Sequence, residues 1–227
     1  MRVSPIMVAC TMPLATPPVA DPTPSTADDS VRANLRRTMR ARREALSPQQ
    51  RIAAAQGLRH VLDTSAAFCQ ARNIGGYWAC AGELPLNLAL ASVQQRRQHY
   101  WLPRVQPGRQ LEFAEWHSGD PVLANRFGIP EPAADAAALA AADMDVLLLP
   151  LLAFDATGNR LGTGGGFYDR TLAFLKSSPR PAKPLLIGIG YGFQQVEQLA
   201  AEDWDIPLDA VATETQLIEC AHQRSAE

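Results

Sequence analysis

The chain has 227 residues, of which 47% are hydrophobic and 19% charged, with a formal net charge of −2. This length suffices for one large domain with a sizeable core, and the near-neutral charge gives no global reason to expect nucleic acid or an anionic membrane as a partner. No apolar run approaches the roughly 18 residues of a membrane-spanning helix, and four scattered cysteines without a Cys-x-x-Cys pair argue against a disulfide framework or a zinc site and fit a reducing, cytoplasmic compartment.

The first 29 residues differ in composition from the rest. They hold six prolines and no aromatic residue, a composition that buries too little surface to order itself. The apolar stretch 6–10 is too short for a secretory signal, and Pro13 interrupts the residues after it. We therefore predict a disordered N-terminal tail over residues 1–29, one domain over 30–220 and a short C-terminal tail over 221–227.

Two helices are expected to open the domain. The apolar residues at helical spacing after Ser30, an N-cap candidate, are Val31, Leu35, Met39 and Leu46. The second helix begins at "SPQQ", where Ser47 caps, Pro48 takes the first helical position and Gln50 completes a capping box.

From residue 73 onward, strands and helices alternate. Strands are expected at 73–78, 100–105, 111–116, 145–150, 184–190 and 210–213, and helices at 86–98, 133–142 and 194–200. "DVLLLP", residues 145–150, is a continuous apolar run typical of a central strand covered on both faces. The alternation predicts a three-layer α/β/α single domain with a mostly parallel central sheet.

The stretch "NRLGTGGGFYDR", residues 159–170, has four glycines in five positions. It follows the central strand by about ten residues and precedes an apolar helical stretch, which places it at the carboxyl end of the sheet where such folds bind ligands. Glycines let successive main-chain N–H groups converge on an anion. A mobile glycine-rich turn is the alternative, but it gives no reason for Tyr168, Asp169 and Arg170. Asp169 beside a bound phosphate is best explained by Mg²⁺.

Charge is unevenly distributed along the chain. Residues 30–60 contain eight arginines and one acid, whereas residues 197–219 contain seven acids and no lysine or arginine. Most of these arginines are expected on a solvated helix face, but Arg32 and Arg36, one turn apart, could grip a polyphosphate together. Asp205, in "EDWDIPLD", is a candidate second carboxylate on the Mg²⁺ side.

The sequence resembles the 5-formyltetrahydrofolate cyclo-ligase family. The resemblance covers nearly all of residues 31–218, and its most specific segment is "LLPLLAFDATGNRLGTGGGFYDRTLAFL". Weaker segments follow the family's order: "LSPQQR", "YWACAGELPLN", "FGIPEP" and "EDWDIPLDAVATE". The family implies a three-layer α/β fold, a requirement for ATP and Mg²⁺, and 5-formyltetrahydrofolate as substrate.

The resemblance also implies roles for individual residues. The implied ATP-binding set is Arg32, Arg36, Arg160, Leu161, Gly162, Thr163, Gly164, Gly165, Gly166, Phe167 and Tyr168. The implied substrate-binding set is Trp78, Glu83, Gly165, Gly166 and Phe167, with Asp169 and Asp205 as metal ligands and Arg160, Tyr168 and Asp169 as catalytic residues. Thr163 and Gly165 stand where some members have Arg and Lys, which leaves Arg160 or Arg36 to neutralise the transferring phosphate.

The implied chemistry agrees with the residues present. Phosphorylation of the formyl oxygen would activate the carbon for attack by the substrate's own N10, so the protein needs positioning and charge neutralisation more than a nucleophile. Cys80 and the four histidines lie in no recognisable nucleophile–base pattern. We expect a monomer that binds small molecules.

Three alternatives remain open on the sequence alone. Another ATP- or phosphosugar-handling enzyme would keep the glycine loop but not the pterin site. An RNA-binding module would use the arginines and lose affinity steeply with salt. A purely structural domain would leave Asp169 unexplained.

Overall fold

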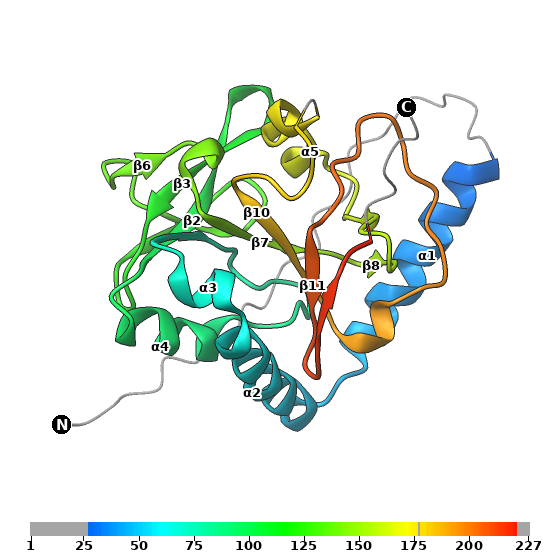
Figure 1. Ribbon diagram of the computed structural model, residues 1–227, viewed down its shortest axis with the longest axis horizontal. Coiled ribbons are helices and arrows are strands. Elements are labelled where there is room, and N and C mark those ends of the chain that lie inside the picture. Colours follow the sequence, from blue (N-terminus) through cyan, green and yellow to red (C-terminus); the bar gives the residue numbers. More distant parts are fainter. Residues whose placement is uncertain (1–26, 177, 222–227) are drawn as a thin grey trace.

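The computed structural model describes residues 27–176 and 178–221 (Figure 1). The predicted N-terminal tail therefore falls almost wholly outside the described residues, as does the C-terminal tail beyond Ala221. The first helix, α1 (Ala27–Glu44), begins three residues before the expected start at Ser30. No helix in the described ranges is both long enough and apolar enough to cross a membrane.

An eight-stranded sheet forms the centre of the fold, in the order β12-β11-β10-β7-β1-β2-β3-β6. Its strands are β1 (Asn73–Gly75), β2 (His99–Gln106), β3 (Gln110–Glu115), β6 (Ala138–Leu139), β7 (Val146–Pro150), β10 (Leu185–Ile189), β11 (Ala210–Ala212) and β12 (Leu217–Glu219). The five strands from β11 to β2 are parallel, and the outer ones are antiparallel. The predicted mostly parallel α/β sheet is confirmed.

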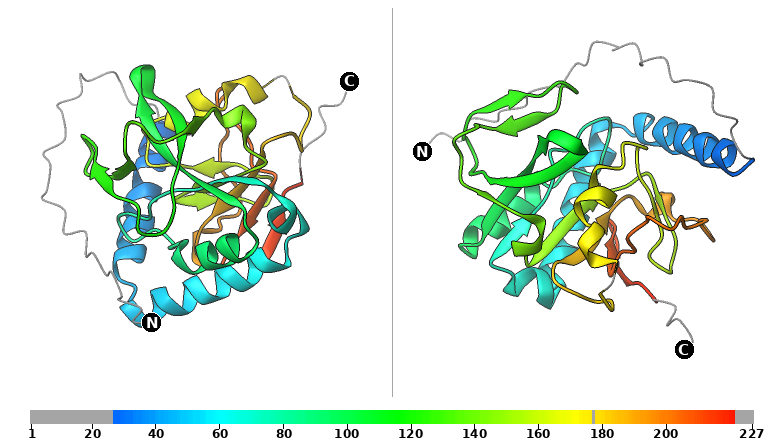
Figure 2. Two further views of the ribbon diagram at one scale, coloured as in Figure 1. Left: turned by 90° about the vertical axis from the view of Figure 1, so that its left-hand side faces the viewer. Right: turned by 90° about the horizontal axis from the view of Figure 1, so that it is seen from above.

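Helices lie on both faces of this sheet (Figures 1 and 2). They are α2 (Pro48–Thr64), α3 (Ala66–Gln70), α4 (Asn87–Gln95) and α5 (Phe167–Thr171), with 3-10 turns at Pro107–Arg109, Ala141–Asp143, Ala173–Leu175 and Gly192–Gln194. Two further ribbons stand apart from the sheet, β4 (Val122–Ala124) with β5 (Pro130–Pro132), and β8 (Ala153–Phe154) with β9 (Arg160–Leu161).

Alternate residues of β7 show how the core is divided. Leu148 is buried in the cluster under α2, α3 and α4, whereas Leu147 and Leu149 belong to the cluster on the opposite face, near α5. Each strand side chain points to the face opposite its neighbour's, so a strand covered on both sides must be apolar throughout. A third small cluster joins Met39 of α1 to Leu161 of β9.

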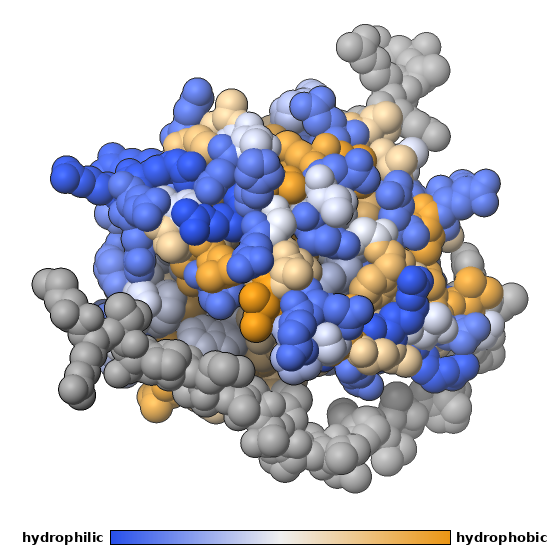
Figure 3. Space-filling model, turned by 90° about the horizontal axis from the view of Figure 1, so that it is seen from below, coloured by the Kyte–Doolittle hydropathy of each residue, from blue (hydrophilic) through white to orange (hydrophobic). Residues whose placement is uncertain are grey.

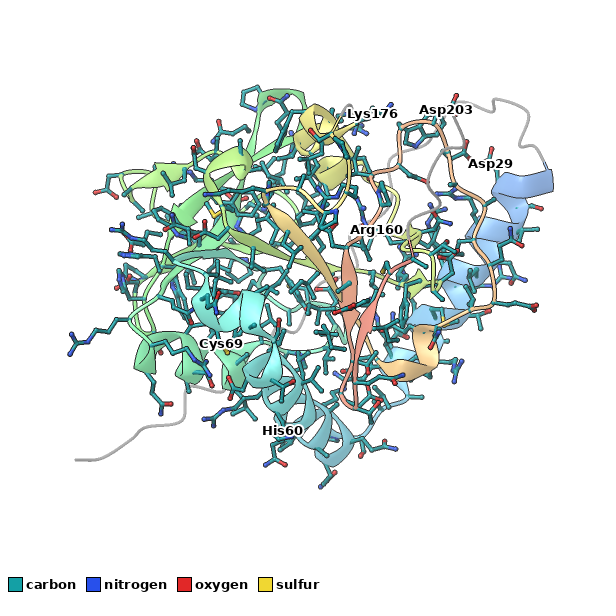
Figure 4. All side chains as sticks on the ribbon, in the orientation of Figure 1. Asp29, His60, Cys69, Arg160, Lys176 and Asp203 are labelled. Carbon is teal, nitrogen blue, oxygen red and sulfur yellow. The ribbon has the colours of Figure 1, made fainter. Side chains whose placement is uncertain are left out.

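The outer surface differs from this interior. Seen from below, where α2 and α4 lie in Figure 1, hydrophilic side chains are interspersed with smaller hydrophobic areas (Figure 3). Arg160 lies inside the molecule, whereas His60 is exposed on α2 (Figure 4).

The start of α2 is confirmed in detail. Ser47 accepts a hydrogen bond from the Gln50 N–H at 3.2 Å, and the Gln50 side chain accepts one from the Ser47 N–H at 2.8 Å. Most predicted strands are also confirmed with shifts of one or two residues. β1 is the exception, because it ends at Gly75 rather than Trp78, and the segment after it continues as an irregular loop.

Two predicted helices are wrong. The alanine-rich stretch 133–142 forms a turn, the short strand β6 and a 3-10 turn instead, and Leu139 pairs with Phe113 of β3. Residues 194–200 form no helix beyond the 3-10 turn that ends at Gln194. There the Gln194 side chain donates to the carbonyls of Leu151 and Leu152. These tertiary contacts override a local helical preference. α3, β12 and the two small ribbons were not anticipated.

Candidate functional site

One cleft of about 620 Å³ gathers almost all of the predicted site residues. Its walls are α1, the glycine loop, the segment after β1, the β4–β5 hairpin and the loop 202–205. The predicted residues that line it are Arg32, Arg36, Trp78, Glu83, Arg160, Gly162, Thr163, Gly164, Gly165, Gly166, Phe167, Tyr168, Asp169 and Asp205. Leu161 does not line it, because its side chain is buried in the cluster with Met39.

The cleft lies where the parallel strands end. Pro150, the last residue of β7, and Leu151 contribute to its floor, and Tyr77 and Trp78 follow β1. This is the position where open α/β sheets bind ligands.

The glycine loop presents unoccupied main-chain donors to the cleft. Among the described residues, none accepts a hydrogen bond from the N–H groups of 162–166. Gly164 and Gly166 have φ of +101° and +66°, which side-chain-bearing residues rarely adopt. A glycine loop whose N–H groups have no acceptor among the described residues is suited to an anion.

Arg160 is committed to contacts inside the protein. Its side chain is only 6% exposed, its Nη2 lies 2.5 Å from Asp169 Oδ1, and its Nη1 donates to the carbonyl of Ile206. Arg160 therefore ties the start of α5 to the segment that carries Asp205, instead of projecting freely into the cleft.

The arginines of α1 concentrate positive charge on one wall. Arg36 Nε donates to the Gly162 carbonyl at 3.0 Å, and Arg40 donates to the Thr163 carbonyl at 3.3 Å. Partial burial lowers the pKa of Arg36, and the like charges of Arg32 and Arg40 lower it further. A bound anion would relieve this repulsion.

Two carboxylates, those of Glu202 and Asp205, face Arg32 on this basic wall. Arg32 lies 3.6 Å from Asp205, and Asp205 also accepts a hydrogen bond from the Glu202 N–H at 3.0 Å. In the described ranges, no group of three or more His, Cys, Asp or Glu side chains could hold a metal ion by itself. The donor set is therefore suited to a cation that takes its other ligands from a bound phosphate and from water.

The opposite half of the cleft is aromatic and contains the half-buried acid Glu83. Glu83 Oε2 accepts a hydrogen bond from the Cys80 N–H at 3.0 Å. Burial raises the pKa of Glu83, while the Cys80 N–H and the charge of Arg43 act in the opposite direction. Burial also raises the pKa of Tyr168, so this phenol stays neutral and can act as a hydrogen-bond donor.

The β4–β5 hairpin contributes residues to which the sequence pointed only as part of the "FGIPEP" segment. They are Asn125, Phe127, Ile129 and Glu131. The Phe127 ring packs edge-on against Phe167 with centroids 5.6 Å apart. Glu131 accepts hydrogen bonds from the Val105 N–H at 2.9 Å and from the Asn125 amide at 2.7 Å, which fixes the hairpin to β2. Nothing in the residue pattern alone assigned them a role.

Arg43 corrects the expectation for the basic helix. It is only 1% exposed, whereas the arginines of this segment were expected mainly on a solvated face. Met39 lies one helical turn earlier and is buried too, so the apolar stripe of Leu35 and Met39 continues into Arg43. The position of Arg43 four residues after Met39, on the apolar side of the helix, was the sequence feature that could have predicted its burial.

Known proteins resemble this chain over most of its length. The 5-formyltetrahydrofolate cyclo-ligase family matches residues 28–214. The 5-formyltetrahydrofolate cyclo-ligase of Haemophilus influenzae is 38% identical over 142 residues, covering 61% of this chain and 74% of that protein. The Escherichia coli K12 protein of the same name is 34% identical over 187 residues, covering 80% of this chain and 99% of that protein. The solved structure of Aquifex aeolicus 5,10-methenyltetrahydrofolate synthetase superimposes with a TM-score of 0.73 at 29% identity, covering 87% of this chain and 96% of that one.

Proposed function

We infer the chemistry of the cleft from the premise that this chain belongs to the 5-formyltetrahydrofolate cyclo-ligase family. It is a cyclo-ligase that converts 5-formyltetrahydrofolate to 5,10-methenyltetrahydrofolate, the activity for which its relatives are named. The observation that carries the assignment is the pairing, in one cleft, of a basic glycine-loop half with an aromatic half that contains Glu83.

We propose that ATP drives the reaction. A formamide carbon is a poor electrophile and its oxygen a poor leaving group. Transfer of the γ-phosphoryl group to the formyl oxygen releases ADP and makes that oxygen part of a phosphate. The substrate's N10 then attacks the formyl carbon, N10 loses its proton, and the C–O bond breaks with departure of inorganic phosphate to leave the methenyl bridge. Because the substrate supplies the nucleophile, the protein contributes mainly position and charge.

The basic half would bind the triphosphate. The free N–H groups of 162–166 and the guanidinium of Arg36 are the donors available to phosphate oxygens. Of the two candidates for neutralising the transferring phosphate, Arg36 is the better supported, since Arg160 is held by Asp169 and Ile206. Thr163 and Gly165 carry no charge, so the residue that neutralises the transferring phosphate would come from α1.

Asp169 and Asp205 would hold the Mg²⁺. Both line the cleft beside the basic wall, and each forms an ion pair with an arginine, Asp169 with Arg160 and Asp205 with Arg32. When bound there, Mg²⁺ would offset the charge of the phosphate oxygens and remove their repulsion from these carboxylates.

The aromatic half would bind the folate. Glu83 would accept hydrogen bonds from the amino and ring N–H groups of the pterin, and Trp78 would line the same pocket. Phe127 and Phe167 form an apolar edge where the hairpin meets the glycine loop, suited to the p-aminobenzoyl ring. The neutral Tyr168 lies in the cleft with both halves and could donate a hydrogen bond to either substrate.

The test is to mix protein, ATP, Mg²⁺ and 5-formyltetrahydrofolate and follow the near-ultraviolet absorbance of the methenyl product. Product should form only with all components present. Product formed without nucleotide would refute the phosphorylation route. Binding of RNA that weakens steeply with salt, with no product formed, would favour the nucleic-acid alternative. Gel filtration tests the expected monomer.

A further inference from the structure

Arg43 is a buried cation that the proposed reaction leaves without a role. It lies near the end of α1, is 1% exposed, and forms no ion pair with a described carboxylate. Its Nε has no hydrogen-bond partner among the described residues. An unpaired charge in the interior is costly, so its retention calls for a compensating interaction.

The turn Cys80–Glu83 packs directly against Arg43. The Glu83 N–H donates to the Cys80 carbonyl at 2.9 Å, and the central residues Ala81 and Gly82 both have positive φ, at 47° and 75°. A Cβ atom added to Gly82 would lie 3.3 Å from both the Cβ and the carbonyl oxygen of Arg43. The end of α1 at Arg43 is therefore in close contact with the turn that holds Glu83.

Charge links the two residues across this contact. Burial lowers the pKa of Arg43, and the nearby Glu83 offsets this more than any other group. Burial likewise raises the pKa of Glu83, and Arg43 is the charged group that opposes the rise. The other titratable groups around Glu83 are the Cys80 thiol, in the same turn, and the phenols of Tyr77, Tyr168 and Tyr191. Burial raises the pKa values of the three phenols, so all three are neutral.

We propose that Arg43 is a positioning residue that keeps Glu83 ionised and aimed into the cleft. Because no ion pair joins the two described side chains, Arg43 compensates the charge of Glu83 without occupying the carboxylate. Glu83 Oε2 accepts from the Cys80 N–H, and the residue lines the cleft. The identity of the ligand, a pterin with N–H donors, rests on the proposed function; the electrostatic link between Arg43 and Glu83 does not.

The first experiment tests the link in the free protein. Glutamate side-chain carboxyls are labelled with ¹³C and titrated by NMR, with the Glu83 signal assigned through its loss in Glu83→Gln. Arg43→Met should raise the Glu83 midpoint by about one pH unit, and Arg43→Lys should restore it. Arg37→Met, an exposed arginine on the same helix, is the matched control and should change nothing. If Arg43→Met does not fold, Arg43→Gln replaces it. An unchanged midpoint in a folded Arg43 variant overturns the proposal.

The second experiment tests the consequence for binding. At the pH of the free-protein midpoint, Arg43→Met should weaken binding of 5-formyltetrahydrofolate several-fold and leave ATP binding unchanged. In a Glu83→Gln background the same substitution should cause no further loss, because there is no carboxylate left to support. An equal loss in both backgrounds would mean that Arg43 acts through the fold, and overturns the proposal. If wild-type protein binds no folate, the proposed function fails, while the NMR titration still decides the link.

Discussion

The guanidinium of Arg160 and the carboxylate of Asp169 meet at 2.5 Å across the glycine loop. Arg160 comes two residues before Gly162, and Asp169 comes directly after the aromatic pair that follows the loop, so the ion pair joins the two ends of the loop. The pair is mostly buried, with side-chain exposures of 6% and 25%. The loop therefore has fixed ends and a middle whose N–H groups have no acceptor in the part of the chain that the structure describes.

Asp169→Asn should reduce kcat by about 10²-fold, of the order expected when one charge-stabilising group is lost. The fold should survive, since the asparagine oxygen can still accept from Arg160. Turnover at saturating substrates and thermal melting measure the two effects. Asp203→Asn, an exposed acid on the adjoining loop, is the control. Full activity of Asp169→Asn at ordinary Mg²⁺ would remove this residue from the site.

Glu83→Gln should weaken folate binding by about 1.5–3 kcal/mol, the range for a hydrogen bond to a charged group. ATP binding measured without folate should hardly change, because Glu83 belongs to the other half of the cleft. Since burial raises the pKa of Glu83, wild-type folate binding should weaken as the pH falls through that raised value. In Glu83→Gln, folate binding should no longer weaken in this way at low pH. Equal losses for both ligands would indicate misfolding.

Gly164→Ala should raise the KM for ATP several-fold, because φ at this position is +101° and the added methyl group would point toward Arg36. Gly119→Ala is a matched control, with φ of +102° and open space around the position. Both variants should lose about 1–2 kcal/mol of stability from the strained backbone. A change in the KM for ATP in both would show that the effect is not local.

Phe127→Ala should raise the KM for 5-formyltetrahydrofolate by about tenfold, roughly the loss of one partly buried aromatic contact. The KM for ATP should stay constant. Leu123→Ala, on the same hairpin and 73% exposed, tests whether any apolar truncation there has the same effect. No change for Phe127→Ala would place the p-aminobenzoyl ring elsewhere.

Removal of residues 1–26 should leave activity and melting temperature nearly unchanged, because their composition offers no apolar periodicity for docking. The cut belongs before Ala27, where α1 begins, since Asp29 already lines the cleft. Removal of residues 1–36 takes Arg32 and Arg36 as well and should abolish ATP binding. A large fall in melting temperature after the shorter deletion would refute this prediction.

The sequence was most informative where local chemistry decides the structure. The capping box of Ser47 and Gln50 and the fully apolar run of β7 each specify their element alone, and both formed as expected. The alanine-rich stretch 133–142 misled because alanine favours a helix but offers no apolar face to bury. Leu139 instead pairs with Phe113, a contact that no local window contains.

The residues of the candidate site also divide into those that the sequence predicts and those that it does not. The glycine loop and its flanking residues were identifiable because one short stretch carries them all. The contribution of Phe127 depends on the hairpin folding over the glycine loop, and the burial of Arg43 depends on the turn Cys80–Glu83 packing on α1. Such contacts arise from packing between distant segments, which periodicity does not encode.

The contacts of α1 also determine when the cleft can exist during synthesis of the protein. Arg36 donates to a carbonyl 126 positions later in the chain, and Arg32 to one 168 positions later. A ribosome that has made the first 150 residues has therefore produced both arginines but neither the glycine loop nor Asp205. The proposed nucleotide-binding wall can close only when the last quarter of the chain has emerged, so a nascent chain that stalls earlier lacks the complete cleft.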